Sequence, residues 1–277
     1  GDAESEITRV QVTLDGINTS TGQTTVQQGT LALSDVGSLG STSVHIGGAG
    51  AALDISGANG DRSIGTFSGV VGTHVQLGAR NLSLGNAASS SFGGAIHGSG
   101  GIVKQGSGTL TLTGVNDFTG GTTIDAGTLV LSGVGSLAAA GAVNLGSGGT
   151  FDISATNSSS TIGALAGAAG SSVALGGKTL TFGDASNTSF AGTITGTGGV
   201  LVKQGAGTQT LTGANSYTGG TTINAGTLQV GNGGTAGALG KGAVTNNGTL
   251  AINRSDSITV ANTLSGTGAL VQRGTGT

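Results

Sequence analysis

The chain of 277 residues contains no cysteine, proline, methionine or tryptophan. Without cysteine it can form no disulfide, no thiolate nucleophile and no cysteine-ligated zinc site. Without proline its strands keep the backbone N–H groups that a β-ladder uses. Aromatic residues are also few, one tyrosine and six phenylalanines, so the chain cannot offer many stacking platforms to nucleic-acid bases.

Charge is equally scarce. Nine Lys and Arg stand against twelve Asp and Glu, which gives a net charge of −3. A weakly acidic chain without basic clusters is a poor partner for nucleic acid. No apolar run reaches the roughly 18 residues that a membrane-spanning helix needs. The first residues show no basic segment followed by an apolar one, so they predict no signal peptide.

Glycine is abundant, with 60 residues, and Ser and Thr accompany it. Such a composition is typical of flexible linkers. Two observations argue against a disordered chain: 35% of the residues are hydrophobic, and the mean hydropathy is +0.21. A chain this apolar has enough material for a core.

The apolar residues alternate with small polar ones in short runs. Residues 109–113 read TLTLT, residues 128–132 read TLVLS, and residues 179–183 read TLTFG. This period of two predicts strands with one buried and one wet face. Glycine-rich turn signals separate the runs, and no window carries a helical stripe. The sequence therefore predicts an all-β fold.

One phrase occurs twice. Residues 101–130 read GIVKQGSGTLTLTGVNDFTGGTTIDAGTLV, and residues 199–230 read GVLVKQGAGTQTLTGANSYTGGTTINAGTLQV. The echo extends beyond both segments at an offset of 98 or 99 residues. We therefore predict one β-helical unit over 1–277, with super-repeats at about 20–118 and 119–217 and a shortened third copy at 218–277.

A fixed period favours a solenoid over a sandwich or a barrel. In a parallel β-helix, each strand pairs with the coils above and below while its inner side chains fill the bore. This arrangement explains why alternation occurs in a parallel sheet. With roughly 20 residues per coil, the chain would form about 13 or 14 coils.

The repeated phrase resembles the passenger-associated transport repeat of autotransporters, the type V secreted proteins of Gram-negative bacteria. VKQGSGTLTLTG at 103–114, FTGGTTI at 118–124 and AGTL at 126–129 carry the resemblance. The copy at 202–228 matches as well, except that Gln209 replaces Leu110. Partial copies lie at 24–33 and 270–277.

The resemblance implies a right-handed parallel β-helix, exported through the outer membrane by a C-terminal β-barrel that this sequence lacks. Family passengers are commonly adhesins, self-associating aggregation factors, or stems for a separate effector domain. The expected location is the cell surface or the extracellular medium. The expected partner is a host-cell surface or matrix component, or another copy of the chain.

Three histidines, His45, His74 and His97, are the first candidates for a metal site. Their counterparts in the next super-repeat are Asn, Ser and Thr, so the array folds without them. They could lie on one face, but no carboxylate cluster accompanies them. We expect exposed histidines without a function.

The aspartates are spread singly, which disfavours a glycan-cleaving site with several converging carboxylates. Asp54 and Asp152 are repeat-equivalent and should point outward, too far apart to act together. The scattered acids are Asp15, Asp35, Asp54, Asp61, Asp117, Asp125, Asp152, Asp184 and Asp256.

Polar residues inside the repeated phrase allow two interpretations. Lys104 and Lys203 are expected to be solvated at a coil corner, where they would discourage edge pairing. Alternatively, they could form a polar stripe for a partner, together with the repeated Asn and Thr side chains. Ladder stabilisation by aligned Asn and Thr is the favoured alternative. The residues in question are Asn116, Asn215, Thr122, Thr123, Thr221 and Thr222.

The sequence thus predicts a non-catalytic passenger that adheres or self-associates through an extended polar face. A non-binding stem is the alternative, and a glycan-cleaving β-helix is the least favoured. No catalytic, cofactor-binding or metal-binding residue is expected, and no cofactor.

Overall fold

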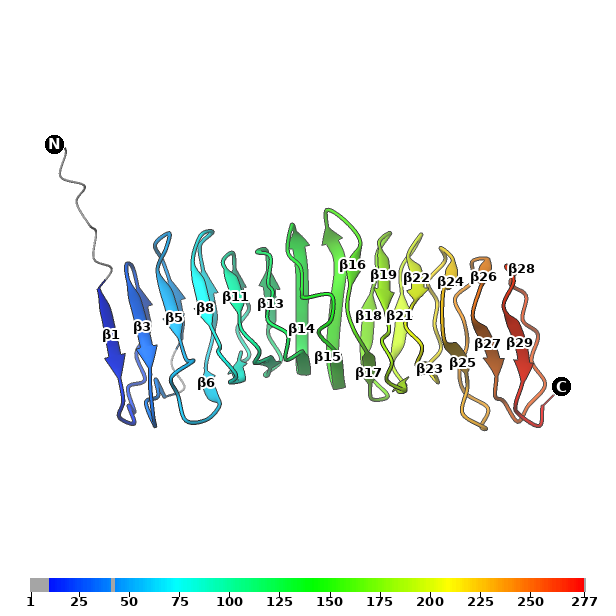
Figure 1. Ribbon diagram of the computed structural model, residues 1–277, viewed down its shortest axis with the longest axis horizontal. Coiled ribbons are helices and arrows are strands. Elements are labelled where there is room, and N and C mark those ends of the chain that lie inside the picture. Colours follow the sequence, from blue (N-terminus) through cyan, green and yellow to red (C-terminus); the bar gives the residue numbers. More distant parts are fainter. Residues whose placement is uncertain (1–9, 41–42, 277) are drawn as a thin grey trace.

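The chain winds into one long parallel β-solenoid. The computed structural model describes residues 10–40 and 43–276, and regular structure there consists only of strands. Thr277, the last residue of the shortened third copy, lies outside the described residues. Figure 1 shows the strands side by side along the long axis, from β1 (Gln11–Leu14) to β29 (Ala269–Gln272). Neighbouring strands pair in parallel, which confirms the expected all-β parallel β-helix.

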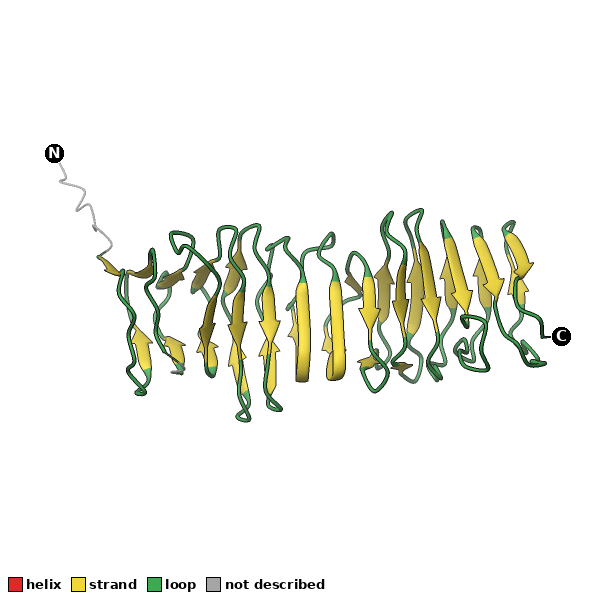
Figure 2. Ribbon diagram, turned by 90° about the horizontal axis from the view of Figure 1, so that it is seen from below, coloured by secondary structure: helices red, strands yellow, loops and turns green. Residues whose placement is uncertain are grey.

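Three sets of paired strands make up the walls of the solenoid, and Figure 2 shows them from a second side. A five-stranded sheet covers the N-terminal part: β1, β3 (Thr30–Leu33), β5 (Ala52–Asp54), β8 (His74–Gln76) and β11 (Ala95–His97). A six-stranded sheet covers the C-terminal part: β16 (Ser160–Thr161), β19 (Thr179–Phe182), β22 (Val200–Lys203), β24 (Thr221–Ile223), β26 (Val244–Asn246) and β28 (Leu264–Ser265).

The remaining strands form the largest set, which runs the length of the solenoid. Its strands are β2 (Thr24–Val26), β4 (Val44–Ile46), β6 (Arg62–Ile64), β7 (Phe67–Gly69), β9 (Leu82–Leu84), β10 (Ser90–Phe92), β12 (Ile102–Lys104), β13 (Thr109–Leu112), β14 (Thr122–Gly133), β15 (Val143–Thr156), β17 (Leu165–Gly167), β18 (Ser172–Ala174), β20 (Thr188–Phe190), β21 (Thr193–Thr195), β23 (Thr208–Leu211), β25 (Thr227–Val230), β27 (Thr249–Ile252) and β29.

The coils vary in length, and many are longer than the sequence suggested. Paired residues are separated by 19 positions between β1 and β3 and by up to 23 between β4 and β7. The solenoid consequently has about 12 turns, and the expected 13 or 14 coils were an overestimate. The difference arises because loops between strands lengthen many coils beyond 20 residues.

The bore is filled by aligned apolar side chains. Register places the buried Leu110, Leu129, Phe151, Val173 and Ile194 at successive levels of one column. The intervening strand residues are half-buried or exposed, as alternation predicts. Each fully buried side chain of this size contributes about 1.5–3 kcal/mol relative to an exposed one, so the columns supply the main driving force for stacking.

Coils approach each other closely where glycine follows β13 and β23. At Gly114 an added Cβ would overlap the carbonyl oxygen of Gly94 in the preceding coil. The repeat-equivalent Gly213 meets the carbonyl oxygen of Gly192 in the same way. Glycine at these positions therefore allows backbone-to-backbone contact that no other residue permits.

Candidate functional site

The lysine of the repeated phrase lies inside the solenoid. Lys104 is 1% exposed, and its Nζ donates hydrogen bonds to the carbonyl oxygens of Gln105 (2.7 Å), Gly106 (2.8 Å) and Ala126 (3.2 Å). Ala126 belongs to the next coil, so the ammonium group bridges two coils. The expectation of a solvated lysine at a coil corner is wrong, because strand alternation carries its side chain inward.

Lys203 repeats this arrangement in the second copy. It is also 1% exposed and donates to the carbonyl oxygens of Gln204 (2.6 Å), Gly205 (2.9 Å) and Ala225 (3.4 Å). Burial lowers the pKa of both lysines, and the charge of Asp184 partly opposes this effect on the pKa of Lys203. Neither lysine is available to a partner on the surface.

The repeated asparagines are ladder stabilisers, as the favoured interpretation predicted. The Oδ1 atom of Asn116 accepts a hydrogen bond from the N–H of Ile96 (3.0 Å), one coil earlier. Its Nδ2 donates to the carbonyl oxygens of Gly114 (2.9 Å) and Ser136 (2.8 Å), the latter one coil later. Asn116 is buried, so its amide replaces strand pairing at a bend where backbone groups would otherwise lack partners.

Asn215 holds the second copy in the same way. Its Oδ1 accepts from the N–H of Ile194 (2.8 Å), and its Nδ2 donates to the carbonyl oxygen of Ala238 (2.7 Å). The flanking coils are thus tied together through one amide side chain in both copies. The alternative of an outward polar stripe made of these asparagines is wrong.

The threonine pairs divide between the two faces. Thr122 and Thr221 are buried, and the hydroxyl of Thr221 lies 2.7 Å from the hydroxyl of the buried Tyr217. Burial raises the pKa of that tyrosine. Thr123 and Thr222 are half-buried and face outward. Only one member of each pair is therefore accessible to a partner.

A column of hydroxyl groups follows the outer face of five consecutive coils. Register aligns one hydroxyl residue from each of β13, β14, β15, β18 and β21. Four are half-buried and the last is exposed. The Oγ1 of Thr150 and the Oγ of Ser172 lie 2.9 Å apart. We define the hydroxyl column as Thr109, Thr128, Thr150, Ser172 and Thr193.

The hydroxyl column is a polar outer surface made of other residues than those of the predicted polar stripe. A shorter series, Thr208, Thr227 and Thr249, follows in the C-terminal coils. Alternation within each strand could have revealed these positions, because each hydroxyl directly precedes an inward apolar residue or Gln209.

The histidines are placed differently from one another. The Nδ1 of His45 lies 2.9 Å from the hydroxyl of Ser68. His74 and His97 contact each other across neighbouring coils, with 3.3 Å between Nδ1 and Nε2, and the Nδ1 of His97 lies 2.8 Å from Oδ1 of Asp117. A single carboxylate, that of Asp117, accompanies His97. Among the described residues, no group of three or more His, Cys, Asp or Glu side chains is suited to hold a metal ion.

The repeat-equivalent aspartates close turns. Oδ1 of Asp54 accepts from the N–H of Ser56, and Oδ1 of Asp152 accepts from the N–H of Ser154, both at 2.8 Å. This is the side-chain turn that Asx residues commonly form. Both carboxylates are thereby committed to local backbone structure.

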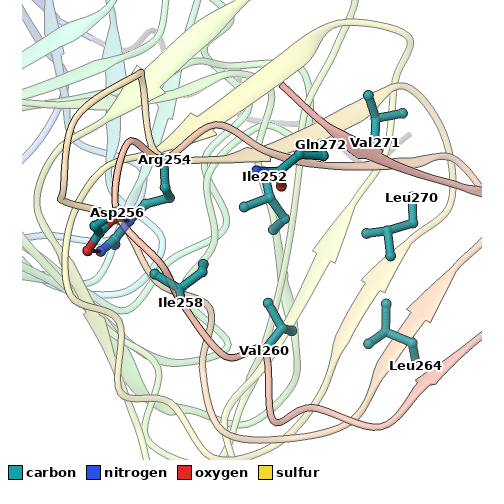
Figure 3. A pocket seen from close by; sticks show the side chains of 9 residues that line it. All are labelled: Ile252, Arg254, Asp256, Ile258, Val260, Leu264, Leu270, Val271 and Gln272. Carbon is teal, nitrogen blue, oxygen red and sulfur yellow. Dashed lines mark hydrogen bonds and ion pairs between the residues drawn. The ribbon is translucent and has the colours of Figure 1, made fainter. Parts of the chain in front are cut away.

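A hollow of about 220 Å³ opens beside β29, the last described strand (Figure 3). Its apolar wall includes Leu270, which is 64% exposed, whereas Leu250 at the equivalent level of the preceding coil is buried. Across the hollow, Arg254 pairs with Asp256 (Nη2–Oδ2 2.7 Å), and this hydrogen bond lowers the pKa of the Asp256 carboxyl. The hollow is bore surface, without the convergent polar groups of a ligand site.

The described residues form no helix long and apolar enough to cross a lipid bilayer.

Comparison with known proteins agrees with the repeat architecture. The model of the passenger-associated-transport-repeat family matches residues 11–33, 102–131 and 201–230. A curated relative, the adhesin BmaC autotransporter of Brucella suis biovar 1 (strain 1330), is 43% identical over 164 residues. That match covers 57% of this chain but only 5% of the adhesin's length. No solved structure matches the chain. The chain thus carries three passenger-associated transport repeats, and these repeats, together with the similarity to this autotransporter, support an autotransporter passenger region.

Proposed function

We propose that this passenger region is an adhesive or self-associating module, displayed on the bacterial surface or released from it, that acts by binding and not by catalysis. The observation that carries the proposal is its 43% identity to a protein named as an autotransporter adhesin. Its partner is a component of a host-cell surface or matrix, or another copy of the chain.

We further propose that the hydroxyl column forms the adhesive face. Hydroxyl groups spaced by one coil, about 4.8 Å, can both donate and accept hydrogen bonds along an extended ligand. The polar groups of the repeated phrase, by contrast, are buried at Lys104, Asn116 and Thr122. Binding is thereby assigned to the outer face of the solenoid and coil stacking to its interior.

We also propose that the chain is divided into super-repeats at about 20–118 and 119–217, with a shortened copy at 218–277. The matching hydrogen bonds of Lys104 and Lys203 support it, as do those of Asn116 and Asn215.

Displaying the passenger on a non-adherent bacterial host tests the proposal. We expect the cells to clump or to bind host cells. In a variant with Thr128→Val, Thr150→Val and Ser172→Ala, three hydroxyls are lost with little change of shape. At about 1 kcal/mol per hydrogen bond, the affinity should fall roughly a hundredfold.

The matched control changes another outer column on the same coils, Thr123→Val with Asn144→Ala. It should adhere like the parent. If the variant without the three hydroxyls adheres as strongly as the parent, the hydroxyl column is not the binding face. A parent passenger that neither clumps nor binds would favour a non-binding stem, and cleavage of a polysaccharide would contradict action by binding alone.

A further inference from the structure

The contact between His74 and His97 is not required by the solenoid. Both side chains lie half-buried on the outer face of the sheet formed by β5, β8 and β11. Register pairs Ala95 with His74 and His97 with Gln76, so the two rings meet diagonally across adjacent coils. In the next super-repeat their places are taken by Ser172 and Thr195, and those coils stack equally well.

The two rings meet edge to edge. Their centroids are 5.5 Å apart, whereas Nδ1 of His74 and Nε2 of His97 are separated by only 3.3 Å. The difference of 2.2 Å is about the sum of the radii of two imidazole rings, which places both nitrogens close to the line between the centroids. With 29° between the ring planes, the in-plane lone pair or N–H of each nitrogen faces the other ring.

Asp117 orients the ring of His97. Its Oδ1 lies 2.8 Å from Nδ1 of His97, and a carboxylate there accepts the Nδ1–H. Neutral His97 then carries its lone pair on Nε2, the atom that faces His74. A carboxylate that orients a histidine through its second nitrogen is the usual support for a histidine metal ligand.

We propose that His74 and His97 bind a divalent transition-metal ion, with zinc as the representative, and that Asp117 acts as the supporting residue. Zinc binds imidazole nitrogen at about 2.0–2.1 Å in tetrahedral geometry, which sets two nitrogen ligands roughly 3.3 Å apart. The nitrogens already have this separation. The rings need to tilt so that both lone pairs converge on the ion, and water fills the other two positions because the site is open to solvent.

Titration of the purified chain with ZnCl₂, followed through the histidine ring signals in NMR spectra, tests this proposal. The best variants are His74→Ser and His97→Thr, which install the residues of the next super-repeat and so preserve the fold. Each should weaken zinc binding at least tenfold, because one of two protein ligands is lost. Asp117→Asn should weaken it by about tenfold, as is typical for a residue that orients a ligand.

The matched control is His45→Asn, since His45 contacts Ser68 and neither of the other histidines; it should bind zinc like the parent. Signals of His74 and His97 that do not move with zinc would overturn the proposal and leave a plain N–H···N hydrogen bond. Equal loss of binding in His45→Asn would overturn it as well. Neither result bears on adhesion through the hydroxyl column.

Discussion

Replacing Gly213 with alanine is expected to lower the free energy of unfolding by about 3 kcal/mol or more. The new methyl group would overlap the carbonyl oxygen of Gly192, a backbone atom that cannot rotate away. The two coils would have to separate, which strains the neighbouring hydrogen bond from the N–H of Thr212 to the carbonyl oxygen of Phe190. Overpacking costs of this kind usually reach 1–3 kcal/mol and exceed that where backbone must move.

Urea unfolding followed by circular dichroism measures this effect. Gly148→Ala is the matched control, because an added Cβ there meets no atom within 4 Å and the backbone carries no positive φ. It should unfold within about 0.5 kcal/mol of the parent. Equal stability of Gly213→Ala and Gly148→Ala would show that the coils do not approach each other as the structure has them.

Replacing Lys104 with methionine is expected to lower the free energy of unfolding by about 2–4 kcal/mol. Methionine fills the space of the apolar stem but donates no hydrogen bond to the three carbonyl oxygens that the ammonium group contacts. Each buried acceptor left without a partner costs about 1–3 kcal/mol. Water that enters the site and binds some of the three carbonyl oxygens offsets part of their combined cost. Lys241→Met, at an exposed lysine, is the control and should be nearly neutral.

The pH dependence of stability provides an independent check on Lys104. Burial lowers the pKa of its ammonium group below the ordinary value of 10.5. Between the lowered pKa and 10.5, the unfolded chain therefore binds more protons than the folded chain. The free energy of unfolding should rise with pH across that window. The rise should be smaller in Lys104→Met, because of the two buried lysines only Lys203 remains. Identical pH profiles for the parent and Lys104→Met would contradict the burial of Lys104.

Much of the fold follows from the sequence, because side chains along a strand point alternately into the bore and outward. The alternation in residues 109–112 predicts which side chains fill the bore, and Leu110 and Leu112 are indeed buried. Repetition at a fixed period predicts stacking in parallel, and the strand pairings confirm it. Coil number was less accurate, because loop lengths are not encoded in the strand pattern.

The interior position of Lys104 was missed although the alternation contains it. Ile102 and Lys104 are two positions apart, so they point to the same face of β12, and Lys104 pairs with the buried Leu84 and Ile124. Lysine is usually exposed, so its residue type predicts the opposite face from the one that the alternation predicts. Two of the carbonyl oxygens that accept its hydrogen bonds, those of Gln105 and Gly106, come from loop backbone, which the sequence pattern does not place.

The outer face was harder to predict for a different reason. Contacts such as those between His74, His97 and Asp117 join three coils, and they depend on a register that varies from 19 to 23 residues. An error of one residue in a coil reverses the face of every side chain in its strand. Only the paired strands show which outward residues become neighbours.

The account depends on the polar residues of the repeats facing inward and leaving the outer face free to bind. Amine-specific labelling of the folded chain, read out by mass spectrometry, tests this directly. Lys104 and Lys203 should react at least tenfold more slowly than the exposed Lys241, and all three should react alike after unfolding in urea. Rapid labelling of Lys104 and Lys203 in the folded chain would contradict the account.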